Sequence, residues 1–185
     1  MKPHGPWLIQ QTSSVYVDPF IDVTLDQVIR PDGRDGQHVV VRLKPGVCVL
    51  ALDDQGCVQL TKEFHYGVGR DSLEAVSGGI EPGEDALLTA QRELQEELGL
   101  IADSWEHVLT IDPFTTVVVS PTRLFLARGL TSVATALEGT EQIEKVVLPL
   151  ATAVAKVLGG EITHAPTCVL LLLADRKFDA VPPPT

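Results

Sequence analysis

The amino-acid sequence predicts a mixed α/β protein, and three observations support this prediction. Short runs of β-branched and other apolar residues, separated by glycine, proline and aspartate, recur along most of the chain and are typical of strands. An amphipathic helix is expected in the middle of these runs, at 85–98. Two more helices are expected closer to the C-terminus, at 151–158 and 166–175.

The first part of the chain is predicted to be an N-terminal strand extension, covering residues 1–45. Residues 14–24 and 38–43 are expected to be strands, and the turn signal Pro31-Asp32-Gly33 lies between them, so that they form a hairpin. Residues 1–12 contain two prolines and are expected to be loosely ordered.

The main domain is expected at 46–180, followed by a loose tail at 181–185 that contains three consecutive prolines. Its first strand, 46–52, is almost entirely apolar, as is typical of a strand buried deep in a sheet. Further strands are expected at 57–64, 73–77, 105–112, 117–127 and 143–148.

The helix at 85–98 has a clear apolar stripe and a clear end. Its stripe consists of residues at three- and four-residue spacing, namely Leu87, Ala90, Leu94 and Leu98. Gly99 follows the last of them and is expected to form a left-handed C-terminal cap.

The composition narrows the classes of function. The 185 residues carry a formal net charge of −11, which disfavours general binding to nucleic-acid phosphates. The three cysteines form no C-x-x-C pair, so that neither a disulfide framework nor a structural zinc site is expected. The expected location of the protein is the reducing cytoplasm. The longest apolar run, 168–174, is far shorter than the roughly 20 residues that span a bilayer.

Carboxylates crowd one side of the predicted helix. Glu93 and Glu97 are one turn apart, about 6 Å along the axis, and Glu96 borders the same face. Like charges at this spacing, close to the C-terminal end of a helix, oppose helix formation. A divalent cation reverses that effect, because hard oxygen ligands around Mg²⁺ or Mn²⁺ favour clustered carboxylates. The alternative for the helix taken alone is a solvated acidic face with Arg92 as partner.

The complete spacing decides between these two readings. Residues 78–100 fit the pattern G-x5-E-x7-R-E-U-x-E-E-x-G-U, where U is a bulky aliphatic residue, at every fixed position. The matching residues are Gly78, Glu84, Arg92, Glu93, Leu94, Glu96, Glu97, Gly99 and Leu100. This pattern is the Nudix box, and the chain resembles the family of Nudix hydrolases.

The resemblance implies an α/β/α sandwich with a mixed β-sheet, and a hydrolase that cleaves a pyrophosphate bond with Mg²⁺ or Mn²⁺. It makes Glu93 and Glu97 the main metal ligands and Glu96 the third. The carbonyl group of Ser77 is a possible further oxygen ligand. Glu84 is expected to reach Arg92 and to fix its orientation.

A weaker resemblance points to the branch of ADP-ribose and nucleotide-sugar pyrophosphatases. It rests on the segment 16–33, on Lys62-Glu63-Phe64-His65 and on Pro113, which lies near the usual proline of that branch. In this branch the N-terminal hairpin often crosses to a second subunit, which implies a homodimer. Glu63 and His65 stand where the branch usually has glutamine and an arginine that serves the substrate phosphates, so that the sugar and the base stay open.

The remaining site residues are less sharply defined. The branch supplies a general base from a later loop, which implies Glu141 as the base or an additional metal ligand, with Glu138 as the substitute; both are otherwise ordinary loop acids. Arg70 and His65 are candidates for phosphate contacts, and Arg70 is the better one because its charge is permanent; the alternative for His65, a surface or interface histidine, is favoured over a phosphate contact. Phe114 either stacks on a base or packs in the core.

The sequence therefore predicts a metal-dependent hydrolase of a nucleoside-diphosphate-linked substrate, ADP-ribose or a nucleotide sugar, that yields a nucleoside monophosphate. Two alternatives stay open. One is a non-catalytic sensor of a nucleotide metabolite, which would not need the clustered carboxylates. The other is hydrolysis of a nucleoside triphosphate.

Overall fold

The computed structural model describes residues 1–135 and 142–179, and these fall into two compact units. The first unit consists of Met1–Pro45 and Asp112–Pro121, and the second of Gly46–Ile111 and Thr122–Thr185. The segment Asp112–Pro121 is therefore part of the first unit although it interrupts the second unit in the sequence. None of the helices in the described part of the chain is both long and apolar enough to cross a membrane.

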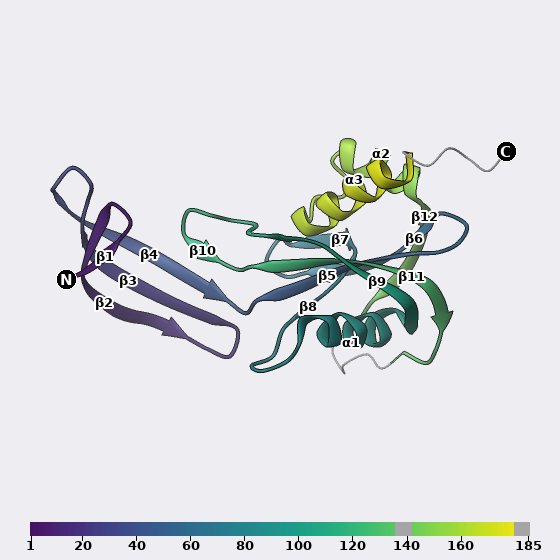
Figure 1. Ribbon diagram of the computed structural model, residues 1–185, viewed down its shortest axis with the longest axis horizontal. Helices are drawn as coiled ribbons and strands as arrows, with labels where there is room; N and C mark the ends of the chain where they lie inside the picture. The colour runs from purple at the N-terminus through teal and green to yellow at the C-terminus, as the bar shows by residue number, and fades with distance from the viewer. Residues whose placement is uncertain (136–141, 180–185) are drawn as a thin grey trace. The chain divides into compact units, whose positions relative to one another are not determined.

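The first unit is a five-stranded sheet in the order β1-β2-β3-β4-β10 (Figure 1). Its strands are β1 (Lys2–His4), β2 (Trp7–Val17), β3 (Ile21–Ile29), β4 (Asp35–Leu43) and β10 (Val118–Val119). The predicted hairpin around Pro31-Asp32-Gly33 is the β3–β4 hairpin. The expectation that residues 1–12 are loosely ordered is wrong, because Gly5, with φ of 57°, closes a turn that pairs β1 with β2.

The second unit is a seven-stranded mixed sheet in the order β12-β6-β5-β11-β9, with β7 on β6 and β8 on β5. Its strands are β5 (Gly46–Leu52), β6 (Cys57–His65), β7 (Arg70–Glu74), β8 (Val76–Gly79), β9 (Leu100–Ile111), β11 (Thr122–Ser132) and β12 (Glu144–Pro149). Its helices are α1 (Ala86–Leu98), α2 (Leu150–Leu158) and α3 (Ala165–Asp179). The pair β5 and β11 is parallel, and the other pairs are antiparallel.

Helices cover both faces of this sheet, so that the predicted α/β/α sandwich with a mixed sheet is confirmed. The alternation along β5 shows the two layers: Cys48 and Leu50 belong to the core cluster beneath α2 and α3, whereas Val47 and Val49 belong to the cluster beneath α1. Figure 1 shows α1 on one side of the sheet and α2 with α3 on the other. Strand β5 is therefore buried on both faces, which explains why its sequence is continuously apolar.

Helix α1 begins and ends at the residues that the sequence indicates. The carboxylate of Asp85 accepts hydrogen bonds from the backbone N–H groups of Leu87 and Leu88 at the N-terminus. Gly99, with φ of 60°, forms the predicted left-handed cap. Leu94 and Leu98 are buried beneath the helix, so that the carboxylates at 93, 96 and 97 are held on its more exposed sides.

The chain that leads to α1 is divided into two strands, although the sequence indicates a single strand at 73–77. Strand β7 ends at Glu74 and pairs with β6, whereas β8 begins at Val76 and pairs with β5. Between them, the N–H group of Ala75 donates to Thr167 Oγ1 of α3 instead of to a neighbouring strand. This change of partner places Ser77 opposite Cys48 in the centre of the sheet.

Candidate active site

The carboxylate of Glu93 lies directly over the backbone of Gly78. A methyl group added at Gly78 would be 2.0 Å from Glu93 Oε1 and 2.1 Å from Glu93 Cδ, far inside van der Waals contact. The Glu93 side chain is 14% exposed in this position. Strand β8 and helix α1 can therefore hold the carboxylate between them only because position 78 has no side chain.

Arg92 connects the carboxylates of this region. Its Nη1 atom lies 2.9 Å from both Glu93 Oε1 and Glu96 Oε2, and its Nε atom donates to Glu84 Oε1 at 3.2 Å. The expected contact between Glu84 and Arg92 is thus present. The hydrogen bond from Arg92 lowers the pKa of Glu84 to about 2, and the same contact raises the pKa of Arg92.

Ser77 lies on β8, the strand that packs against α1, and Glu97 lies on α1. Ser77 is the register partner of Cys48 on β5. Burial raises the pKa of the Cys48 thiol far above its ordinary value, and the charges of Glu74 and Glu97 add to that shift.

The donor chemistry of this region fits a hard divalent cation. Glu93, Glu96 and Glu97 supply carboxylate oxygens along one helix, and the space above Gly78 is open to a carboxylate because no Cβ fills it. Within residues 1–135 and 142–179, no three His, Cys, Asp or Glu side chains already converge with the geometry of a metal site. In the described arrangement Glu93 and Glu96 share the guanidinium group of Arg92 instead.

A second cluster of titratable groups lies where β6, β7 and α3 meet. Glu74, which is 9% exposed, has His65 Nε2 3.3 Å from its Oε1 atom and His164 Nδ1 3.1 Å from its Oε2 atom. Burial lowers the pKa of His164; Glu74 opposes this shift, and His65 adds to it. No pattern in the sequence predicts this cluster, because Glu74 and His164 are 90 positions apart.

The other predicted site residues lie outside the box helix. Arg70 and His65 are register partners at the end of the β6–β7 ladder, and Arg70 Nη2 donates to Thr163 Oγ1 at 2.8 Å. Phe114 is 67% exposed and belongs to the first unit, so that it does not pack in a core. Glu141 and Glu138, the candidates for the general base, lie outside the described residues.

Comparison with known proteins agrees with this geometry. The family model of the NUDIX domain matches residues 42–163, which is more than half of the chain. An ADP-ribose pyrophosphatase of Mycobacterium tuberculosis (strain ATCC 25618 / H37Rv) is 32% identical over 143 residues, covering 76% of this chain and 69% of that protein. A CMP-5'-(N-acetyl-N-hydroxy-3-aminopropyl)phosphonate hydrolase of Streptomyces rubellomurinus (strain ATCC 31215) is 27% identical over 166 residues, covering 90% of this chain and 81% of that protein.

A solved structure shares the fold along nearly the whole chain. The crystal structure of an ADP compounds hydrolase superposes with a TM-score of 0.79 at 21% identity, covering 97% of this chain and 98% of that chain. The family match, the relative above 30% identity and the complete carboxylate motif on α1 lead to one assignment. The chain belongs to the Nudix family and is a hydrolase.

Proposed function

We propose that the protein hydrolyses the pyrophosphate bond of a nucleoside-diphosphate-linked substrate, and that ADP-ribose or a nucleotide sugar is this substrate. The observation that carries the proposal is the carboxylate of Glu93 held over Gly78, with Glu96 and Glu97 on the same helix. The similarity to the mycobacterial ADP-ribose pyrophosphatase supports this class of substrate. The products are a nucleoside monophosphate and a phosphorylated second group.

Each box residue has a role in this proposal. Glu93 and Glu97 would hold Mg²⁺ or Mn²⁺, with Glu96 as third ligand and the carbonyl oxygen of Ser77 as a further one. The bound cation would neutralise the diphosphate and lower the pKa of the attacking water. Arg92, held by Glu84, positions the carboxylates of Glu93 and Glu96 through its Nη1 atom.

The groups outside the box complete the proposal. Glu141, or Glu138 in its place, would accept the proton of the attacking water. Arg70 and His65 would contact the substrate phosphates, and Phe114 would stack on a ring of the substrate. His65 pairs with Arg70 in the β6–β7 ladder and stands where the branch usually has an arginine, so that several nucleotides are to be tested beside ADP-ribose.

We further propose that the enzyme is a homodimer formed through the first unit. One face of its sheet is apolar across both long central strands, because Ile21 pairs with Leu43, Val23 with Val41 and Leu25 with Val39. Val39 is 42% and Leu43 37% exposed, so that a second copy of the chain would bury apolar surface there.

The three cysteines are free, which supports a reducing compartment, the cytoplasm.

A light-scattering measurement tests the dimer. The protein is expected at twice its chain mass of 19.9 kDa, and Val39→Asp is expected to shift it to the single-chain mass. Thr24→Asp, on the opposite face of the same sheet, is the matched control and should keep the double mass. A single-chain mass for the unmodified protein contradicts the dimer without affecting the proposed activity.

A substrate screen tests the activity. ADP-ribose, nucleotide sugars, a CMP-linked phosphonate, dinucleotides and nucleoside triphosphates are incubated with Mg²⁺ or Mn²⁺, and the released nucleoside monophosphate or phosphate is measured. Turnover of a nucleoside diphosphate derivative, lost in Glu97→Gln, is the expected result. Tight binding of a nucleotide without any turnover would instead indicate a sensor, and turnover of triphosphates alone would move the substrate to that class.

A further inference from the structure

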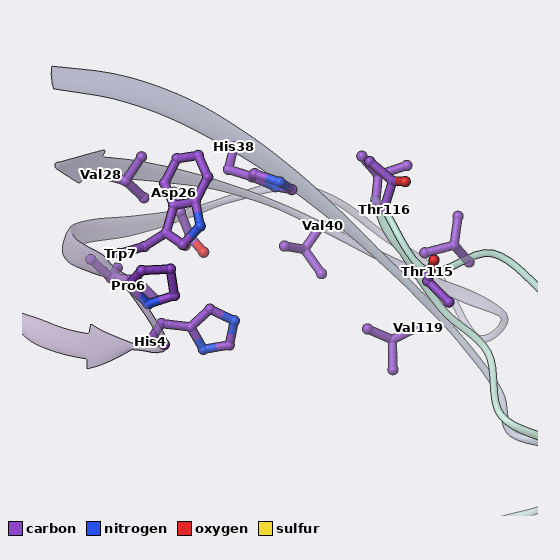
Figure 2. A pocket seen from close by; sticks show the side chains of 14 residues that line it. His4, Pro6, Trp7, Asp26, Val28, His38, Val40, Thr115, Thr116 and Val119 are labelled. Atoms are coloured by element: carbon purple, nitrogen blue, oxygen red, sulfur yellow. The ribbon is translucent and has the colours of Figure 1, made fainter. Parts of the chain in front are cut away.

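The first unit contains a cavity of about 410 Å³ that the proposed hydrolysis does not use. Strands β2, β3 and β4 supply one wall and residues 115–119 another (Figure 2). Asp26, Val28, His38 and Val40 alternate along β3 and β4, so that they share one face of the sheet. Its volume lies within the range of roughly 300–1,000 Å³ that is usual for sites of small organic ligands.

A buried carboxylate without a counter-charge lines this cavity. Asp26 is 8% exposed, and its Oδ1 atom accepts a hydrogen bond from Thr12 Oγ1. No lysine, arginine or histidine forms an ion pair with Asp26 among residues 1–135 and 142–179. Buried charges in proteins are normally paired, because an isolated charge loses its hydration without compensation. The cavity therefore offers a carboxylate that a cationic ligand could pair with.

The aromatic and aliphatic side chains that line the cavity indicate which kind of cation would bind there. The indole ring of Trp7 lines the cavity and meets the ring of His38 edge-on, with centroids 5.8 Å apart at 83°. Figure 2 shows Trp7, His4 and Asp26 around one end of the cavity and Val40 and Val119 toward the other. An aromatic ring beside a carboxylate attracts an organic ammonium group through the ring quadrupole and the negative charge together.

We propose that this cavity binds a small organic ammonium ion that carries an apolar or aromatic group. The ammonium group pairs with Asp26 in the cavity that Trp7 also lines, and the apolar group lies against Ile9, Val28 and Val40. A bare metal ion does not suit the cavity, because His4, His38 and Asp26 line it without converging as a metal site among the described residues, and aliphatic side chains form much of the wall. An anion does not suit it either, because Asp26 repels negative charge. All residues that line the cavity belong to the first unit, whereas the box residues belong to the second.

Fluorescence of Trp7 tests the proposal on the full chain. The sequence has two tryptophans, so that Trp105→Phe leaves Trp7 as the single reporter. Benzylammonium is titrated at pH 7 and benzyl alcohol serves as the neutral compound of the same shape. We expect a saturable change in Trp7 emission with the ammonium ion, and binding at least tenfold weaker with the alcohol. Calorimetric titration of the wild-type chain gives the same comparison without the Trp105 substitution.

Asp26→Asn provides the decisive variant, because the amide oxygen can still accept from Thr12 Oγ1 while the charge is removed. Its dissociation constant for benzylammonium should rise at least tenfold, whereas Asp35→Asn, at an exposed position of the same sheet, should leave it unchanged. Equal affinity for the alcohol, unchanged affinity in Asp26→Asn, or no saturable binding of the ammonium ion overturns the proposal. None of these results depends on turnover, so that the proposed hydrolase activity is tested independently.

Discussion

Substitution of Gly78 by alanine should displace the Glu93 carboxylate while leaving the stability of the fold almost unchanged. The added Cβ would lie 2.0 Å from Glu93 Oε1 and 2.6 Å from Glu93 Cγ. Ordinary van der Waals contact begins at about 3.4 Å, and the difference from 2.0 Å means that the oxygen must move by at least about 1.4 Å. The carboxylate ends a flexible side chain, so that it can move without displacing the backbone.

The expected result is a large kinetic effect with a small effect on stability. A displacement of about 1 Å at a catalytic centre costs roughly 100-fold in rate, and we expect kcat of Gly78→Ala to fall by at least that factor. The Mg²⁺ concentration for half-maximal activity should rise as well, because Glu93 is a proposed ligand. Gly78 has no positive φ, so that the free energy of unfolding should change by less than about 1 kcal/mol.

Gly46→Ala is the matched control for this experiment. Gly46 lies on β5 and pairs with Gly79, next to Gly78, but its added Cβ would meet the nearest atom, the carbonyl oxygen of Gly78, at 3.5 Å, which is ordinary contact. Initial rates at varied Mg²⁺ and thermal unfolding by circular dichroism are measured for both variants. A wild-type kcat in Gly78→Ala would refute the reasoning that the position of the Glu93 carboxylate over Gly78 governs the activity. An equal loss of kcat in Gly46→Ala would refute it as well.

Three further predictions concern the site and its surroundings. Glu97→Gln keeps the size of the side chain but weakens a proposed metal ligand, so that turnover should fall at least about 100-fold in a metal-dependent assay while the unfolding temperature is unchanged. Arg92→Lys keeps the charge but loses the forked contact with Glu84; kcat should fall roughly tenfold, and an unchanged rate would argue against a positioning role. Burial lowers the pKa of His164 in the folded state below 6.5, so that the unfolded chain takes up the proton first as the pH falls. The free energy of unfolding should therefore decrease below about pH 6.5, and chemical denaturation of His164→Gln should show a shallower decrease.

The sequence predicts those parts of the protein that depend on neighbours along the chain. Helix α1 follows from the spacing of its apolar residues and from Gly99, because caps and helical periodicity are local properties. The carboxylates at 93, 96 and 97 follow from the box spacing for the same reason, and so does the contact between Glu84 and Arg92, which lie eight residues apart in one loop–helix unit.

The sequence is less informative about strands that change partners. The run at 73–77 has the composition of a single strand, yet β7 and β8 pair with different strands because Thr167, on a distant helix, accepts the N–H group of Ala75. Residues 1–12 were expected to lack order because of their prolines, but pairing between β1 and β2 orders them. Strand pairing is decided by the partner strand, which no local pattern specifies.

The sequence by itself determined the fold class, the box helix and the identity of its carboxylates, since each depends on side chains within a few turns of one another. Only the tertiary structure decided that Glu93 lies over Gly78, that His65 and His164 meet at Glu74, and that residues 112–121 join the first unit around the cavity of Asp26. The contacts of Glu93 and of the two histidines join residues 9 to 90 positions apart, and their geometry follows from how sheets and helices pack rather than from any spacing in the chain.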